Sequence, residues 1–510
     1  MEQILILDFG SQYTQLIARR LRNSKVYCEI LPYSAAIEEI KGKQPKGLIL
    51  SGGPSNIYSV NAPRISRGVF ETGIPVLGIC YGMQLISHIK GGLVSKARKR
   101  EYGLSEVKIV EKTPLFEGLP SKITAWMSHG DEVKKNPPGF KVTGKTNEIS
   151  IAAMENPQKN IYAVQFHPEV HHTQFGEKII ENFARKICGV EKEWNPYDFV
   201  KESIRKIRNE IGRLSAVCAL SGGVDSSVAA VIVNKAIGRR LNCIFVDTGL
   251  LRIGDRERIE NIFRKRFRFN IKIANASGLF LSRLKGIEDP EKKRKIIGKT
   301  FIEVFEKEAK KIKNAGFLVQ GTLYPDIIES VSVKGPSAVI KSHHNVGGLP
   351  EKMGLKIVEP LKFLFKDEVR RIGARLFIPR EILSQHPFPG PGLAIRIIGS
   401  VTRRRLEILR RADKIMRQEI TKAGWYDKIW QAFCVLLPIK SVGVMGDERS
   451  YENVLAIRAV ESVDGMTADW SKIPHKLLGK ISSRIISEVK GINRIVYDTT
   501  SKPPATIEWE

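Results

Sequence analysis

The residue most able to perform chemistry in the first third of the chain is a cysteine between two glycines. Cys80 stands in the sequence GICYG (residues 78–82), after an apolar run and before a helical pattern. This order is typical of a nucleophile elbow, because glycines permit a sharp turn from strand to helix and the helix N-terminus favours the reactive thiolate. A buried, unreactive cysteine is the alternative interpretation.

A base and an acid stand further along the same third. His167 and Glu169 follow the apolar run 161–164 and are two residues apart. On an extended chain such residues point to the same side, so we expect Glu169 to orient the imidazole of His167 toward Cys80. The sequence SGGP (residues 51–54) follows another apolar run and offers glycine N–H groups for an oxyanion hole. Together these residue types predict nucleophilic catalysis by a thiolate.

A second candidate site is the glycine-rich stretch SGGVDSS, which consists of Ser221, Gly222, Gly223, Val224, Asp225, Ser226 and Ser227. It lies between a predicted strand at 214–220 and a predicted helix at 228–237, so its N–H groups and hydroxyls can face a phosphate. No lysine follows the glycines, so the Walker grip used in γ-phosphoryl transfer is missing. The motif resembles the pyrophosphate loop of enzymes that cleave ATP between its α and β phosphates. A Ser/Gly-rich surface turn is the alternative interpretation.

Charged residues later in the chain could complete a phosphate site. Lys341 and Lys366 could neutralise charge on a leaving pyrophosphate, and the carboxylates of Asp225 and Asp367 are the oxygen ligands that Mg²⁺ prefers. A solvated helix face is the alternative interpretation of the segment around Lys366.

Two proline-containing stretches near the end of the chain could form a second nucleotide grip. They are HPFPGPGLAIR (386–396) and KPPATIEWE (502–510), and prolines stiffen such loops before any ligand binds. In the second stretch, Lys502 and Glu508 could hold a phosphate and a sugar or base edge.

The elements that must position these residues follow an α/β pattern. Apolar runs alternate with amphipathic helices in the first third, at residues 4–7, 15–22, 47–50, 75–79 and 84–89. This alternation predicts a parallel sheet covered by helices. Further predicted strands at 243–246 and 317–319 each precede a polar turn, and glycine and proline mark a boundary at 188–197.

Composition limits the class of protein. A chain of 510 residues is too long for one hydrophobic core and predicts about two to four domains. No run reaches the roughly 18 apolar residues that span a bilayer, the first apolar run is a predicted strand and not a signal segment, and six scattered cysteines form no CxxC pair. We therefore expect a reduced, cytoplasmic protein without a membrane partner. The net charge of +29 comes from short clusters mixed with acids, which favours a solvated basic surface over nucleic-acid binding.

The motifs GICYGMQ, SGGP and HPEV together resemble the class I glutamine amidotransferases over residues 1–190. The resemblance implies that Cys80 attacks the side-chain amide of glutamine, that His167 shuttles the proton and that Glu169 orients His167. It also implies that the N–H groups of Gly53 and Tyr81 hold the oxyanion, and that ammonia and glutamate leave. The sequence MSHGD (127–131) resembles a segment beside the glutamine site in that family, although a turn explains it equally well.

The whole chain resembles the glutamine-hydrolysing GMP synthetase family through an ordered series of motifs: SGGVDSS, FVDTGLLR, GTLYPDIIES, KSHHNVGGLP, HPFPGPGLAIR, SVGVMGDERSY, DGMTADW and KPPATIEWE. The resemblance implies an α/β protein of three domains. These are an amidotransferase domain at 1–190, an ATP pyrophosphatase domain with a doubly wound parallel sheet at 191–385, and an α+β dimerisation domain at 386–510.

The family's reaction follows from the resemblance as an expectation. ATP adenylates xanthosine 5′-monophosphate, and ammonia then displaces AMP to give GMP, with Mg²⁺ accompanying the pyrophosphate. The resemblance implies ATP binding by residues 221–227, a homodimer formed through the last domain, and a nucleotide site near Arg396, Lys502, Ile507 and Glu508.

Two alternatives remain at this point. An NAD-forming amidating enzyme shares the pyrophosphate loop but lacks GICYG and HPEV. An RNA-modifying enzyme that adenylates a tRNA base would use the positive charge to bind the RNA. It would lack the glutaminase and would need reactive cysteines near the loop, whereas Cys218 and Cys243 fall within predicted strands.

Overall fold

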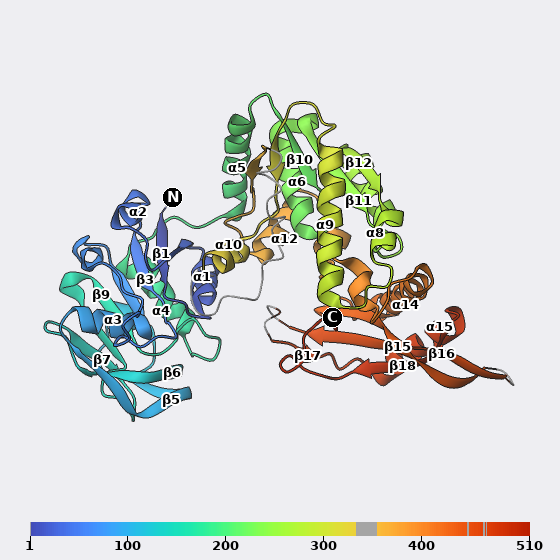
Figure 1. The fold of residues 1–510 in the computed structure, drawn as a ribbon. Helices are drawn as coiled ribbons and strands as arrows, with labels where there is room; N and C mark the ends of the chain where they lie inside the picture. The colour runs from blue at the N-terminus through green and yellow to red at the C-terminus, as the bar shows by residue number, and fades with distance from the viewer. Residues whose placement is uncertain (1, 333–353, 446–447, 463–464, 466) are drawn as a thin grey trace. The chain divides into compact units, whose positions relative to one another are not determined.

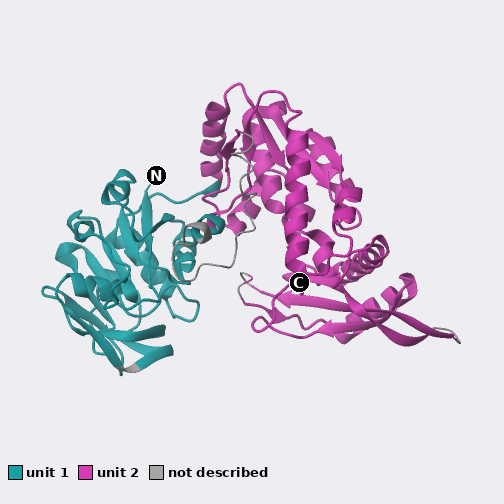
Figure 2. Ribbon diagram, viewed as in Figure 1, with its two compact units in different colours: residues 1–196, 325–342 teal, residues 197–324, 343–510 magenta. Residues whose placement is uncertain are grey.

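The computed structural model describes residues 2–332, 354–445, 448–462, 465 and 467–510. The chain divides into two compact units, the first made of residues 1–196 and 325–342, and the second of residues 197–324 and 343–510 (Figure 2). The second unit contains two separate sheets. The finer division at residues 190 and 385 stays a prediction.

Over its described residues, the first unit is built on a nine-stranded sheet (Figure 1). Five strands pair in parallel, in the order β2 (Tyr27–Pro32), β1 (Gln3–Asp8), β3 (Gly47–Leu50), β4 (Val76–Ile79) and β9 (Ile161–Val164). Antiparallel strands extend it from β9, namely β8 (Ala153–Asn156), β7 (Lys141–Lys145), β5 (Leu93–Ile109) and β6 (Lys122–Lys135).

The central strands are apolar along their length because helices cover both faces of the sheet. Leu5, Leu7 and Leu48 pack on one face with α2 (Ile37–Gly42) and α3 (Tyr81–Ile89). The opposite face is covered by α1 and α4, which pack against each other and comprise Thr14–Asn23 and Gly176–Asn182.

The second unit contains a parallel sheet with the doubly wound topology. Within the described part of the chain its strand order is β12 (Asn270–Asn275), β11 (Leu241–Asp247), β10 (Ser215–Ala219), β13 (Ala315–Val319) and β14 (Lys356–Val358). The chain leaves β10 first toward β11 and later toward β13, so the loops after β10 and β13 meet where the strand order reverses. In such sheets this point is the usual ligand site.

Helices lie on both faces of this sheet as well. On one face α6 (Val224–Ile237) packs between the sheet and α12 (Lys366–Arg375), which explains why α6 is apolar nearly all round. On the other face α8 (Ser277–Arg283) and α9 (Pro290–Ala309) pack their buried phenylalanines and isoleucines against the sheet.

The end of the chain forms an α+β arrangement around an antiparallel hairpin. The hairpin strands are β15 (Gln431–Met445) and β16 (Glu448–Glu461); β17 (Asp469–Trp470) pairs antiparallel with β16, and β18 (Ile492–Asp498) pairs parallel with it. Two helices pack together beside this sheet, α14 (Arg403–Lys422) and α15 (His475–Glu488).

Shorter or more peripheral elements complete the chain. The remaining helices are α5 (Pro196–Ile211), α7 (Asp255–Ile259), α10 (Tyr324–Ser332) and α13 (Arg380–Leu383). Short 3₁₀ helices span Arg67–Glu71, Pro114–Phe116, Pro157–Lys159, Gly238–Arg240 and Gly392–Arg396. Short π-helical segments span Phe183–Ile187 and Glu260–Arg266.

The predicted fold class is confirmed, one local prediction is wrong, and one alternative interpretation is excluded. The HPEV segment is a turn and not extended chain, so Glu169 meets His167 through a tight bend. The MSHGD segment is not a turn, because residues 127–131 lie inside β6. In the part of the chain that the structure describes, no helix combines the length and apolarity needed to cross a membrane.

Candidate active sites

Cys80 lies at the junction of β4 and α3 in a backbone conformation that side chains rarely adopt. Its φ is +51° and its ψ is −103°. The junction is tight because a Cβ on Gly82 would lie 2.5 Å from the Leu50 carbonyl oxygen, and one on Gly78 would lie 2.7 Å from the carbonyl carbon of Gly82. The two glycines of GICYG are therefore required by close main-chain packing, and together they hold Cys80 at the carboxyl end of β4.

His167 lies at the carboxyl end of β9, the neighbour of β4 in the sheet. Its Nδ1 is 2.8 Å from Glu169 Oε1, and the two side chains are 4% and 0% exposed. Cys80 also interacts with this imidazole and contributes to the raised pKa of His167, so the sulfur lies close to the base. The structure therefore brings the three predicted residues together as thiol, base and orienting acid.

Further contacts hold both the main chain and the ring of His167. The His167 N–H donates to the Trp126 carbonyl at 3.0 Å, and the Thr173 hydroxyl donates to the His167 carbonyl at 2.6 Å. Tyr13 packs its ring edge-on against the imidazole, with ring centres 5.1 Å apart. The imidazole is therefore held in one orientation before any substrate binds.

The electrostatics of this cluster favour a charged imidazole. Burial disfavours protonation, but the Glu169 carboxylate and Cys80 outweigh it and raise the pKa of His167 well above its usual 6.5. An imidazolium next to the sulfur stabilises a thiolate and carries the proton that a leaving amine needs.

The predicted oxyanion donors lie beside this cluster. Gly52 and Gly53 follow β3, and a Cβ on Gly52 would be 3.1 Å from Cε1 of His167, so the glycine main chain presses against the imidazole. A Cβ on Gly53 would be 2.8 Å from the Phe9 carbonyl oxygen. Tyr81 is the first residue of α3, where helical N–H groups have no intrahelical partner. The main chain at Gly53 and Tyr81 is thus compatible with an oxyanion hole.

Sequence reasoning missed a buried polar cluster on the β5–β6 hairpin. Glu101 and His129 face each other across the two strands, with Oε2 and Nε2 3.1 Å apart and side chains 4% and 1% exposed. The Thr146 hydroxyl donates to the second oxygen of Glu101 at 3.1 Å. This cluster fixes the strand that brings the Ser128 carbonyl oxygen to 3.8 Å from the sulfur of Cys80. The family-like segment 127–131 was the only signal in the sequence.

In the second unit, the SGGVDSS loop joins β10 to α6 as a compact turn. Gly222 has φ +77°, and Val224 begins the helix four residues before the predicted start. The Ser221 and Ser226 hydroxyls lie 2.9 Å apart, whereas Ser227 is buried and donates to the Gly223 carbonyl at 2.6 Å. The first N–H groups of α6 therefore remain as anion donors, while Ser227 shapes the loop.

Two further elements complete this site. Gly321, in the loop after β13, packs directly on the start of α6, since a Cβ there would be 3.1 Å from the carbonyl carbon of Asp225. Lys366, the first residue of α12, reaches the loop and places its Nζ 2.5 Å from Asp225 Oδ2. Asp367 instead pairs with Arg371 at 3.0 Å and is 64% exposed. Lys341 lies outside the described residues.

The predicted nucleotide-binding residues meet at the C-terminal sheet, but Arg396 does not face solvent. It is fully buried and makes two hydrogen bonds to Glu508, Nε to Oε2 at 3.1 Å and Nη2 to Oε1 at 2.8 Å. Ile507 packs against Phe433, and Lys502 donates from Nζ to the Gly465 carbonyl at 2.8 Å. Arg396 therefore holds the Glu508 carboxylate in place from the buried side.

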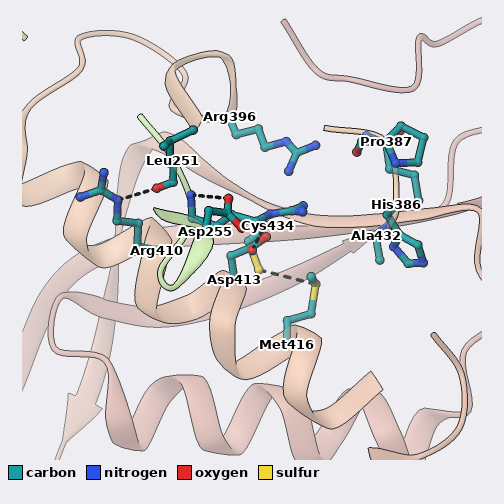
Figure 3. Close-up of polar contacts among 12 residues, drawn as sticks. Leu251, Asp255, His386, Pro387, Arg396, Arg410, Asp413, Met416, Ala432 and Cys434 are labelled. Atoms are coloured by element: carbon teal, nitrogen blue, oxygen red, sulfur yellow. Dashed lines mark hydrogen bonds and ion pairs between the residues drawn. The ribbon is translucent and has the colours of Figure 1, made fainter. Parts of the chain in front are cut away.

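Arg252 is a second residue that sequence reasoning left without a role. Its side chain is 2% exposed, its Nε is 3.2 Å from Asp413 Oδ2, and its guanidinium lies 4.5 Å from the Phe388 ring centre. Among the described residues none of its three nitrogens has a hydrogen-bond partner. Figure 3 shows Asp413 of α14 beside Cys434, whose pKa is raised by burial and by that carboxylate. The position of Arg252 at the end of FVDTGLLR, after β11, was the available signal.

The sequence was compared with known proteins and matches two family models. A family model described as glutamine amidotransferase class-I matches residues 5–187, and one described as GMP synthase C terminal domain matches residues 418–509. A solved structure from Thermoplasma acidophilum, described as that of a GMP synthase subunit, is 36% identical, covers 37% of this chain and 94% of its own, and has a TM-score of 0.35.

The curated relatives extend over the full length. The GMP synthase [glutamine-hydrolyzing] of Elusimicrobium minutum is 61% identical over 100% of both chains, and that of Brachyspira hyodysenteriae is 56% identical over 100% of this chain and 99% of its own. Residues 5–187 thus form a class I glutamine amidotransferase domain, and residues 418–509 form a GMP synthase C-terminal domain in the same chain. The chain belongs to the glutamine-hydrolysing GMP synthase family.

The raised pKa of His167 leads to a prediction for its titration. We expect the imidazole to titrate above pH 6.5, and Glu169→Gln to lower its pKa because the opposing carboxylate is lost. NMR titration of the ring Cε1–H resonance, assigned by its absence in His167→Gln, measures both. Because the folded-state pKa is raised, the cluster stabilises the fold fully below pH 6.5 and progressively less as pH rises through the folded value. An unchanged midpoint in Glu169→Gln would contradict the assignment.

Proposed function

We propose that the chain makes GMP by joining two reactions, glutamine hydrolysis in the first unit and adenylation of xanthosine 5′-monophosphate in the second. The observation that carries the proposal is the presence in one chain of a thiol–imidazole–carboxylate cluster and a lysine-free anion loop. Relatives named GMP synthase [glutamine-hydrolyzing] match both units together over the whole length.

In the first unit, the Cys80 thiolate adds to the amide carbon of glutamine. The N–H groups of Gly53 and Tyr81 stabilise the oxyanion, and the proton held by His167 passes to the leaving nitrogen, so that ammonia departs and a γ-glutamyl thioester remains. His167 then takes a proton from water, which attacks the thioester and releases glutamate. Glu169 keeps the imidazole oriented throughout.

In the second unit, the loop 221–227 holds the phosphates of ATP through the N–H groups at the start of α6. The oxygen at C2 of the xanthine base attacks the α-phosphorus, and pyrophosphate leaves. Adenylation thereby converts a poor leaving group into a good one, so that ammonia attacks C2 and AMP departs. Lys366 is placed to neutralise charge on the pyrophosphate, and Lys341 is proposed for the same role.

The carboxylate of Asp225 fits a magnesium ion better than that of Asp367. Oδ1 of Asp225 is buried without a hydrogen-bond partner, although Oδ2 pairs with Lys366, so one hard oxygen is free at the loop. No cluster of three or more metal-ligating side chains occurs among the described residues. When bound, Mg²⁺ would neutralise charge on the departing pyrophosphate.

The xanthylate site is assigned to the C-terminal sheet. Lys502 supplies an ammonium group for the phosphate, and Ile507 and Glu508 supply a main-chain and a carboxylate contact. Arg252 adds buried N–H groups that have no hydrogen-bond partner among the described residues, although the guanidinium pairs with Asp413, and such groups suit a phosphate. Arg396 holds Glu508 in place.

A homodimer is proposed through the long β15–β16 hairpin. This sheet exposes apolar side chains, namely Ile439, Val442, Val444, Tyr451 and Val496, with exposed fractions between 40% and 74%. Val442 and Tyr451 lie directly opposite each other in the register, so they form one surface. A second copy of the chain would cover such a surface by an isologous contact.

Cys80→Ala tests the division of labour between the units. We expect glutamine-dependent GMP formation to fall by roughly 10³-fold or more, because no thiolate remains, while GMP formation with added ammonium is retained. The assay mixes Mg-ATP and xanthylate with either nitrogen source and measures GMP, AMP and pyrophosphate. Cys28→Ala, which removes another buried cysteine of the same unit, should leave both activities unchanged. Equal loss of both activities in Cys80→Ala would refute two separate sites.

Asp225→Asn and Asp367→Asn compare the two predicted magnesium ligands. We expect Asp225→Asn to slow xanthylate-dependent pyrophosphate release by about 10²-fold, because it replaces the carboxylate at the loop by a neutral amide. Asp367→Asn should have little effect, because that carboxylate is exposed and paired with Arg371. A larger loss in Asp367→Asn would reverse the assignment, and release of ADP and phosphate by the wild type would exclude a pyrophosphate loop.

If the apolar surface of the hairpin forms the dimer interface, two substitutions that place carboxylates on it should separate the two subunits. Val442→Asp combined with Val444→Asp should convert a dimer to a monomer in sedimentation velocity, because two carboxylates cannot be buried without partners. Glutaminase activity should persist. Val110→Asp serves as the control, because Val110 is a 47% exposed valine of the first unit. A wild type that sediments as a monomer at all concentrations would exclude the dimer.

A further inference from the structure

Three cations in the second unit are buried so completely that their side chains are 0% exposed, and all three hold the last residues of the chain. They are Lys293, Arg396 and Arg458. Lys293 donates to Glu510 Oε2 at 2.6 Å, and Arg396 binds Glu508. Burying a cation is unfavourable unless its partners are well placed, so these contacts constrain the tail strongly.

Arg458 makes the most extensive of these contacts. It lies in β16, and its Nε donates to the Ile507 carbonyl at 2.8 Å while Nη2 donates to the Thr506 carbonyl at 2.9 Å. Its Nη1 donates to the Thr500 carbonyl at 3.0 Å and to Asp498 Oδ2 at 2.7 Å. One planar guanidinium thus binds the main chain on both sides of the 501–505 loop.

The loop that Arg458 closes carries Lys502. The main chain of Lys502 exchanges two hydrogen bonds with Ala468, of 2.7 and 3.1 Å, which fixes the middle of the loop to residues outside the tail. Asp498 is held by a second donor, Trp509 Nε1 at 2.8 Å. Burial disfavours the Asp498 carboxylate, but N–H donors and Arg458 outweigh that effect and lower its pKa, so it stays ionised at neutral pH.

We propose that Arg458 is a positioning residue for the nucleotide, which it does not itself contact. Its guanidinium fixes residues 500–507 so that Lys502, Ile507 and Glu508 face the ligand as one preformed surface. This inference rests on the proposed function, because it takes those three residues as the xanthylate site. The geometry requires the fork of an arginine, since a lysine ammonium has three donors on one atom and cannot span four acceptors in a plane.

The test measures KM for xanthylate, KM for ATP and kcat in Arg458→Met and Arg458→Lys, with ammonium as the nitrogen source. We expect both variants to raise KM for xanthylate about tenfold or more, since several charge-assisted hydrogen bonds are lost. KM for ATP should stay within the error of the wild-type value, and kcat at saturating xanthylate should change much less than KM. Restoration of the wild-type KM by lysine would overturn the proposal, because charge alone would then suffice.

Controls separate positioning from general stability. Arg484→Met removes an arginine of the same region that pairs with Glu419 and Glu488 and not with the tail, so it should leave KM for xanthylate unchanged even if the melting temperature falls. Should Arg458→Met fail to fold, Asp498→Asn takes its place: of the four acceptors of Arg458, Asp498 is the one that carries a charge, and its loss should still raise KM for xanthylate more than Arg484→Met does. Equal effects of the two would overturn the proposal.

A failure of the inference is distinguishable from a failure of the proposed function. If Lys502→Ala raises KM for xanthylate while Arg458→Met does not, the nucleotide site stands and the role of Arg458 is wrong. If the wild-type protein forms no GMP from xanthylate, the function itself fails, whatever the variants do.

Discussion

The chemistry of the first unit depends on a main-chain contact that leaves no room for a side chain. Gly82 lies against the Leu50 carbonyl, so α3 begins immediately where β4 ends, and Cys80 is forced into a positive φ at that corner. Because β3, β4 and β9 are adjacent and parallel, their carboxyl ends deliver the Gly52–Gly53 main chain, Cys80 and His167 to one place. The sheet order is thus sufficient to assemble the cluster from three distant segments.

The second unit uses the same device for a different purpose. Its strand-to-helix junction carries Gly222 at positive φ in place of a strained cysteine, and the N–H groups in the first turn of α6 are suited to bind an anion. Gly321, from the loop after the neighbouring strand β13, packs on that helix start as Gly52 packs on His167. In both units, glycines lie in the loops that follow adjacent parallel strands. Because glycine has no side chain, the main chain itself can lie next to the site.

Much of this could be predicted from the sequence, because local signals coincide with the chemistry. Apolar runs of buried strands and glycines beside Cys80 and Asp225 located the sheets and both loops to within a few residues. Contacts set by distant segments could not be predicted. Nothing local shows that Arg396 is covered by Glu508, that Glu101 faces His129 across a hairpin, or that Arg252 is buried beside Phe388. The HPEV segment shows the same limit: the pairing of His167 with Glu169 was right, but the extended geometry offered as its reason was wrong.

The pairing of Asp225 with Lys366 has a consequence for the balance of charge at the loop. Each group serves as the counter-ion of the other, so neither charge is left bare in a partly enclosed site. Arrival of a magnesium–nucleotide complex would let the two exchange partners, the carboxylate turning to the metal and the ammonium to the phosphates. Such a swap conserves the number of ion pairs. The charges at the loop would therefore stay balanced both before and after such an exchange.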